Sequence, residues 1–424
     1  MKIAINNGRL VDYASDLDRV ASLYVAAGRI VAVGDAPDGW HANRVIDASG
    51  LVVAPGLVDL AARLREPGFE YKATLESELG AAVAGGVTSL ACPPDTDPPL
   101  DEPGLVEMLK FRARSHNQAH VYPVGALTVG LQGTTLTEMG ELSEAGCVAF
   151  SHADVPLMDS QLLRRAMQYA STFGYRVWLR PGDPYLSRGG VAHDGEVATR
   201  LGLPGIPAIA ETIALGTILA LARETGVRLH VGRLSAAGSV QMIRDAKAAG
   251  LPVTCDVAIH HLHLCDLDIG WFDANAHLVP PLRTASDRAA LRTGVMDGTI
   301  DAICSDHAPV DDDGKLVPFG EAEPGATGLE LLLPLTLKWA QEDHVPMPAA
   351  LRRITSAPAA ILGVEAGSLA LGRPADICVF DPELWWKVER GALRSQGKNT
   401  PFLGLEVPGR VRYTLAGGQI VHDA

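Results

Sequence analysis

Short apolar runs rich in β-branched residues alternate with helical segments through the middle of this chain of 424 residues. Such repeats favour a parallel sheet covered by helices, and eight of them favour a closed barrel. We therefore predict an α/β fold, a (β/α)8 barrel of the TIM type. An open, doubly wound sheet is the alternative, but no Gly-rich dinucleotide-binding turn follows the first strand. The predicted strands lie at 56–64, 87–93, 119–127, 147–152, 176–182, 228–235, 252–262 and 301–309.

Both ends of the chain differ from this middle part, because they contain short alternating strands separated by Gly-rich turns. We predict one small β-domain built from residues 1–53 and 364–424, with the barrel over 54–363. Two Gly- and Pro-rich segments, 180–207 and 309–328, each follow a barrel strand and are predicted to form loops over its C-terminal mouth. The predicted helices lie at 72–86, 103–115, 159–174, 210–226, 237–250 and 287–298.

Composition excludes several classes of partner. The formal net charge of −14 argues against nucleic acid or an anionic membrane surface. No apolar run approaches the roughly 20 residues that span a bilayer, and the start, MKIAINNGRL, lacks a signal-peptide core. We therefore expect a cytoplasmic protein. The cysteines form no C-x-x-C pair, which agrees with a reducing compartment; they are Cys92, Cys147, Cys255, Cys265, Cys304 and Cys378.

Several long segments carry a family resemblance. The segment APGLVDLAARLREPGFEYKATLESELGAAVAGGVTSLACPPDTDPPLDEP at 54–103 resembles the dihydroorotases of the amidohydrolase superfamily. The resemblance continues through 228–264 and 279–309 and ends with GRPADICVFDP and GKNTPFLG. It implies a mouth that holds one or two zinc ions, which lower the pKa of a bound water and polarise the ring amide of the substrate.

The positions that hold the metal in active relatives contain unsuitable side chains here. Alanine offers no lone pair, and a guanidinium carries a permanent positive charge that repels a cation. The nearest carboxylate to the fourth strand end is Asp154, and only the eighth strand keeps its expected residue, Asp306. We therefore predict no metal and no cofactor, with Asp306 as a vestige of the catalytic site. The altered positions are Ala61, Arg63, Ala153, Arg180 and Arg233.

The substrate side of the site is altered as well. By resemblance, Arg65 matches the arginine that binds the substrate carboxylate, a good bidentate anion partner. Asp95 stands where an amide side chain is expected, and Val279 replaces an asparagine. His307 resembles a residue that contacts the substrate, but without a metal we expect it to be structural.

Two groups of side chains allow more than one interpretation. His260, His261 and His263 could bind a metal, but neighbours on a strand face opposite sides, so packing is the preferred interpretation. His230 is expected in the core. The arginines at the altered positions either turn to solvent or converge on Asp154 and Asp306 to replace the charge of the metal; they are Arg63, Arg180 and Arg233.

The resemblance also implies a role. Chains of this family without metal ligands act as non-catalytic partners of aspartate carbamoyltransferase in pyrimidine biosynthesis, in a hetero-oligomer, a dodecamer of six plus six. We predict such an inactive supporting subunit. The first alternative is an active cyclic amidase whose metal is held by Asp306, His152 and one histidine of 260–263. The second is a regulatory subunit that binds an anion through Arg63, Arg65, Arg180 and Arg233.

Overall fold

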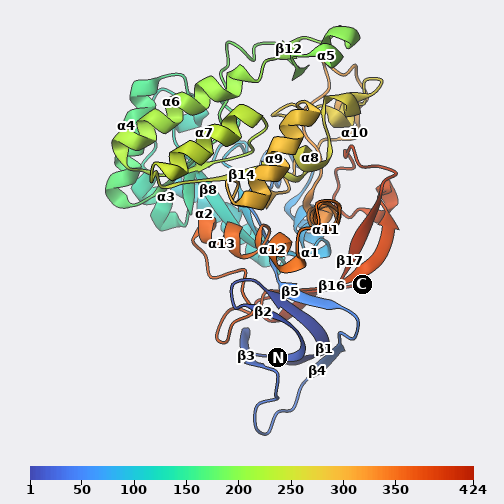
Figure 1. Ribbon diagram of the computed structural model, residues 1–424. Coiled ribbons are helices and arrows are strands. Elements are labelled where there is room, and N and C mark those ends of the chain that lie inside the picture. Colours follow the sequence, from blue (N-terminus) through green and yellow to red (C-terminus); the bar gives the residue numbers. More distant parts are fainter.

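Eight parallel strands form the centre of the molecule in the computed structural model, which describes residues 1–424 (Figure 1). They are paired in sequence order, and the ends of the barrel meet where Ala62 and His307 form a parallel bridge. The predicted (β/α)8 barrel is therefore confirmed. The strands are β6 (Leu57–Asp59), β7 (Val87–Cys92), β8 (His120–Ala126), β9 (Ala149–Ser151), β10 (Arg176–Leu179), β13 (Arg228–Val231), β14 (Val253–Ala258) and β15 (Ala302–Cys304).

The six predicted helices are all present, and their ends lie within three residues of the predicted ends. Thr74 begins the first of them with a capping box, and Gly174, Gly226 and Gly298 end three others in the left-handed conformation that glycine adopts easily. These helices are α1 (Leu75–Ala84), α2 (Pro103–Ser115), α4 (Ser160–Phe173), α6 (Ile209–Thr225), α7 (Ala237–Ala248) and α9 (Ala285–Asp297). No helix has the length and apolar character needed to cross a membrane.

Further short helices were not predicted, and one of them changes the expected structure of a strand. The seventh strand ends at Ala258, and residues Ile259–His263 form the helical turn α8 instead of continuing the strand to 262. A short apolar run does not distinguish a strand from a helical turn, which explains the wrong prediction. The others include α3 (Met139–Ala145), α5 (Glu196–Leu201), α10 (Asp312–Lys315), α11 (Leu332–Glu342), α12 (Met347–Arg352) and α13 (Ser356–Leu362).

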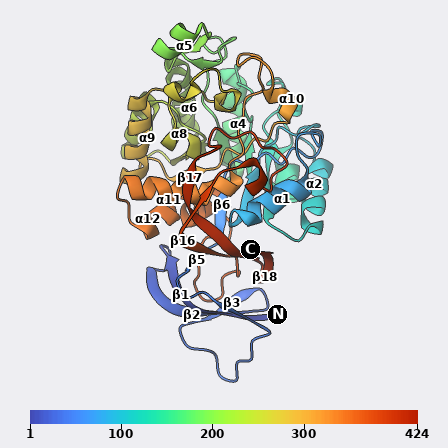
Figure 2. The ribbon, with the colours of Figure 1, turned by 90° about the vertical axis from the view of Figure 1, so that its right-hand side faces the viewer.

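Strands from both ends of the chain share a second sheet, ordered β18–β17–β16–β5–β1–β2–β3, with β4 paired to β1. This sheet lies on the side of the barrel away from α5, and α12 and α13 lie between the two (Figures 1 and 2). The strands are β1 (Lys2–Asp12), β2 (Leu17–Ala26), β3 (Arg29–Val33), β4 (Arg44–Asp47), β5 (Val52–Pro55), β16 (Ile377–Lys387), β17 (Glu406–Ala416) and β18 (Gln419–Asp423).

Side chains alternate across each barrel strand, and this alternation decides which residues meet inside. On β10, Val177 packs outward into the large core beneath the helices, whereas Trp178 packs inward with Val58 and Val124. Inward positions on β10 are therefore 176 and 178, and on β13 they are 228 and 230. The side chains at these four positions point into the barrel: 176 and 228 at the start of the two strands, and 178 and 230 further along them.

Candidate functional site

The chain leaves several barrel strands through residues in the left-handed backbone region. The φ angles are 62° at Arg65, 49° at Ala153, 56° at Arg233 and 46° at Asp306. A residue with a Cβ adopts this conformation rarely and at a cost of about 1–3 kcal/mol. Four strained residues around one barrel mouth identify this rim as the candidate functional site.

One carboxylate at the mouth contacts three arginines. Asp154 accepts hydrogen bonds from Arg63, Arg180 and Arg233, which lie at the ends of the first, fifth and sixth barrel strands. The Arg180 Nε lies 2.6 Å from Asp154 Oδ1, and its Nη2 lies 3.1 Å from the Asp154 carbonyl oxygen. The loop after β9 thus places a negative charge where guanidiniums from three strands meet.

Two further carboxylates complete this group. Arg63 Nε donates to Asp95 Oδ2 at 2.7 Å, and Arg233 Nη1 donates to Asp306 Oδ1 at 2.9 Å. Arg63 Nη1 lies 3.6 Å from the same Asp306 oxygen. The predicted convergence on Asp306 is therefore observed for Arg233 and Arg63, whereas Arg180 contacts Asp154 alone. We call these six residues the guanidinium–carboxylate cluster: Arg63, Arg180, Arg233, Asp95, Asp154 and Asp306.

The charges of this cluster stabilise one another. Burial by itself would raise the pKa of the Asp154 carboxyl, but the guanidiniums of Arg233, Arg63 and Arg180 outweigh burial and hold this pKa well below its ordinary value. Burial would lower the pKa of Arg63 and Arg233, and the neighbouring carboxylates raise both above the ordinary value instead. Three positive and three negative charges therefore form a balanced group.

A polar chain runs from the cluster into the barrel. The Arg233 backbone N–H donates to Asp256 Oδ1 at 2.7 Å, and Asp256 Oδ2 lies 2.9 Å from His230 Nε2. The other ring nitrogen of His230, Nδ1, lies 2.9 Å from the Thr254 hydroxyl. His230 thus lies in the barrel interior, as predicted. Sequence reasoning missed Asp256, although its position two residues after Thr254 on β14 places both on the inward face.

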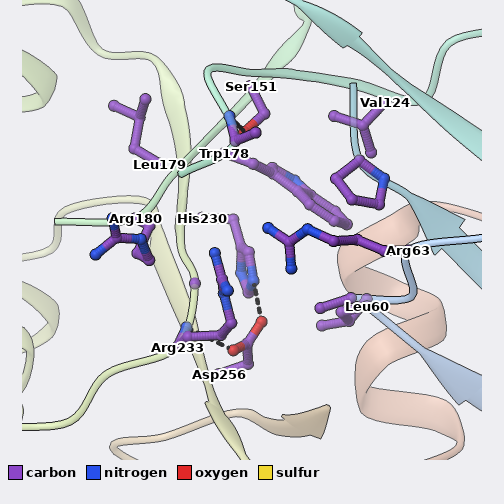
Figure 3. Close-up of a pocket in the computed structure, with 14 residues that line it drawn as sticks. Leu60, Arg63, Val124, Ser151, Trp178, Leu179, Arg180, His230, Arg233 and Asp256 are labelled. Atoms are coloured by element: carbon purple, nitrogen blue, oxygen red, sulfur yellow. Dashed lines mark hydrogen bonds and ion pairs between the residues drawn. The ribbon is translucent and has the colours of Figure 1, made fainter. Parts of the chain in front are cut away.

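A small cavity remains between the guanidinium–carboxylate cluster and the hydrogen-bonded side chains of Asp256 and His230. Figure 3 shows Arg63 and Arg233 extending into it, with Trp178 and His230 beside them. Its volume is about 60 Å³, which corresponds to the volume of roughly two water molecules in the liquid. The arginine side chains occupy the space in which a ligand of the barrel mouth would otherwise lie.

Two predicted substrate-contacting residues lie in other surroundings. Arg65 Nε donates to the Pro309 carbonyl oxygen at 2.9 Å and forms no ion pair; burial, together with the nearby charge of Arg63, lowers its pKa. His307 is fully buried, and its Nε2 lies 2.6 Å from Glu78 Oε2. Its Nδ1 accepts the backbone N–H of Gly328 at 3.1 Å, so Nε2 carries the proton. The ring of His307 does not line the cavity at the mouth, and both of its nitrogens have partners within the chain.

None of the other predicted histidines forms a hydrogen bond with the Asp306 carboxylate, although His260 and His261 lie close enough to feel its charge. His152 lies between the Thr128 hydroxyl and the Val155 carbonyl, each at 2.7 Å. On α8, His261 contacts the Pro281 carbonyl and His263 contacts the Leu335 carbonyl. His260 stacks on Phe402 with a ring-centroid distance of 5.8 Å, and both of its ring nitrogens lack a partner. These rings are held by packing, by backbone carbonyls and, for His152, also by the Thr128 hydroxyl.

The barrel, its added β-sheet and the strand-end site define a protein of the amidohydrolase type. The model of the amidohydrolase family matches residues 191–421, and that of the Dihydro-orotase-like family matches residues 50–239. The chain belongs to the dihydroorotase-like branch of the amidohydrolase family. It is 46% identical over 430 residues to a "Dihydroorotase-like protein" of Pseudomonas aeruginosa, and the match covers all of both chains.

Other relatives have a name that implies activity. A "Dihydroorotase" of Geotalea daltonii is 43% identical over 422 residues, which cover 100% of this chain and 99% of that protein. Among solved structures, the L-hydantoinase (dihydropyrimidinase) of Arthrobacter aurescens superposes with a TM-score of 0.87. That match has 24% identity and covers 99% of this chain and 96% of the other, so it shows a shared fold.

The residues present do not fit the zinc site that the family resemblance implies. Zinc needs three or four converging nitrogen, oxygen or sulfur donors. No group of three or more His, Cys, Asp or Glu side chains is arranged to hold a metal ion. Ala61 and Ala153 supply no donor, and the nearest carboxylates already accept guanidinium hydrogen bonds.

Proposed function

We propose that this chain is a catalytically inactive dihydroorotase-like subunit that supports the assembly and activity of aspartate carbamoyltransferase. The observation that carries the first half of this proposal is the balanced guanidinium–carboxylate cluster at the barrel mouth. Guanidiniums occupy the strand ends where a metal-dependent amidase needs donors, and Asp306 is neutralised by Arg233. The cluster is thus a structural replacement for a metal centre.

The space at the mouth supports the same proposal. A cyclic amide substrate must approach Asp306, but Arg63 and Arg233 lie within ion-pair distance of its Oδ1 atom. Removing either side chain from this position would separate buried opposite charges, which costs several kcal/mol. Among Arg63, Arg65, Arg180 and Arg233 at the mouth, only Arg65 lacks a carboxylate partner. A carboxylate substrate therefore has one candidate contact in place of a complete binding site.

The proposed partner follows from the family resemblance, and co-expression tests it. The chain is produced with and without aspartate carbamoyltransferase from the same source, and the products are sized by light scattering. We expect one hetero-oligomer, with six copies of each chain, and higher carbamoyltransferase activity than the transferase has alone. Separate elution of the two chains at micromolar concentration, with unchanged transferase activity, contradicts the proposal.

The second candidate function is an active dihydroorotase, and the relatives named dihydroorotase at 41–43% identity favour it. Dihydroorotate hydrolysis by the purified chain and its metal content decide between the two. The matched control is Asp306→Asn, which removes the only retained carboxylate of the expected catalytic set. Stoichiometric metal, together with turnover that disappears in Asp306→Asn, establishes the enzyme and refutes an inactive subunit.

A further inference from the structure

We propose that the opposite, N-terminal end of the barrel contains a second binding site, in which Arg176 and Arg228 hold a small organic anion. These arginines begin the neighbouring strands β10 and β13, and they are register partners in the parallel pair. Both line a cavity of about 360 Å³. This site is separate from the guanidinium–carboxylate cluster and does not depend on the function proposed above.

The two guanidiniums lack the partners that every arginine of the cluster has. Neither Arg176 nor Arg228 forms an ion pair or a side-chain hydrogen bond within the chain, whereas Arg63 and Arg233 each contact at least two carboxylates. Like charges on facing positions of adjacent strands are destabilising. Burial lowers the pKa of Arg176, and the charge of Arg228 lowers it further. An anion between them would relieve this repulsion.

The guanidinium of Arg176 packs against the C-terminal end of α13. A Cβ atom at Gly363 would lie 2.4 Å from Arg176 Nη2, so the guanidinium lies directly against the backbone at the end of α13. Gly363 also has a φ of +75°, which glycine adopts without strain. This close approach places the Arg176 charge at the wall of the cavity that Ala360 and Ile361 also line.

The remainder of the cavity indicates the chemistry of the ligand. Leu251, Pro252 and Ile361 form apolar walls, and Trp178 and His230 line its inner end. Trp178 is 7% exposed, and its indole Nε1 has no hydrogen-bond partner. Paired arginines bind a carboxylate or phosphate in bidentate fashion, and apolar walls favour an apolar or aromatic body. The site thus suits a carboxylate or phosphate group attached to such a body.

The location of this site also connects it with the other end of the barrel. Thr254 and His230, which line the cavity, begin the hydrogen-bonded chain that reaches Asp256 and the backbone of Arg233. Trp178 and His230 line this cavity and also the small cavity beside the cluster, which Figure 3 shows. A ligand here would therefore contact side chains that also line the mouth cavity.

Calorimetry on the full chain tests the proposal with four probes at matched ionic strength: phenyl phosphate, benzoate, inorganic phosphate and potassium chloride. We expect saturable binding of phenyl phosphate or benzoate, weaker binding of inorganic phosphate, and none of chloride. Arg176→Ala and Arg228→Ala should each weaken binding by about tenfold or more. Preference for phenyl phosphate or for benzoate identifies the acidic group.

Three further variants make the result decisive. Arg176→Lys keeps the charge and should bind more tightly than Arg176→Ala, which separates loss of the anion contact from loss of packing. Trp178→Phe removes the indole N–H and should weaken binding by a smaller factor. Arg200→Ala removes an exposed arginine on α5, on the other side of the barrel, and should leave binding unchanged. Absence of saturable binding, or equal binding by wild type and both alanine variants, overturns the proposal.

Discussion

The carboxylate shared by three arginines gives the sharpest prediction. Asp154→Asn preserves the shape of the side chain but leaves Arg63, Arg180 and Arg233 without their common negative charge. Removing one partner from a buried ion pair costs about 3–5 kcal/mol. The Asp154 side chain is 29% exposed, against 9% for Arg63 and Arg233, so solvent screens part of this loss. We expect the free energy of unfolding to fall by about 3 kcal/mol.

Equilibrium urea unfolding at pH 7, followed by circular dichroism and checked for reversibility, measures this loss. The matched control is Glu107→Gln on α2, which also removes one negative charge but lies on the exposed side of its helix and has no partner. This control should change the free energy by less than about 0.5 kcal/mol. A loss below about 1 kcal/mol in Asp154→Asn would refute the claim that this carboxylate stabilises the cluster.

The pH dependence of the same difference tests its electrostatic origin. The guanidiniums hold the pKa of folded Asp154 far below the value of about 3.9 for an unfolded aspartate. A lowered folded-state pKa stabilises the protein above the unfolded pKa, and this stabilisation disappears as the pH falls toward the folded pKa. The difference between wild type and Asp154→Asn should stay constant from pH 8 to 5 and decrease only below about pH 4. A decrease in this difference between pH 8 and 6 would show that a group other than Asp154 causes the pH dependence.

Three further predictions concern a buried histidine, the removal of metal and the buried cysteines. Burial lowers the pKa of folded His260 to about 4, below the value of about 6.5 for an unfolded histidine, so acidification from pH 6.5 to 4 favours unfolding. The variant His260→Gln should therefore flatten the slope of the urea midpoint against pH. An unchanged slope contradicts this. Prolonged dialysis against a zinc chelator should leave the urea midpoint unchanged; a lower midpoint would reveal a metal that supports the fold. All six cysteines are buried, and burial raises the pKa of Cys92 to about 12. A thiol reagent should therefore label none of them in the folded chain and all six in guanidinium chloride. Rapid labelling of the native protein refutes this.

Periodicity predicted the barrel well because each of its eight units repeats the same pattern. The ends of the strands were predicted less well: the first predicted strand continued to residue 64, whereas β6 ends at Asp59. The chain turns away from the ladder near the mouth, and residues such as Arg233 and Asp306 have positive φ angles that no glycine signals in the sequence. Local patterns therefore place an element more reliably than its end.

The part of the site that lies at the carboxyl ends of the barrel strands was the part that the sequence could predict. Convergence of the arginines at the first and sixth strand ends near Asp306 could be proposed, with a turn to solvent as the alternative, because parallel strands deliver their carboxyl ends to one rim. The partners of His307 were not predictable, since Glu78 lies 229 residues away and belongs to the outer helix α1. The unpaired Arg176 and Arg228 were not predictable either, because they begin their strands, whereas barrel enzymes carry their chemistry at the carboxyl ends.

Asp154 and Asp306 each contact more than one arginine, and this sharing makes the barrel mouth resistant to stepwise substitution in evolution. Substituting histidine for Arg63 would leave Asp95 and Asp154 short of positive charge before a second nitrogen ligand existed. Each such step would cost several kcal/mol in a protein whose whole stability is about 5–15 kcal/mol. Selection for folding alone is therefore sufficient to preserve these arginines over many generations, whatever chemistry the cell requires.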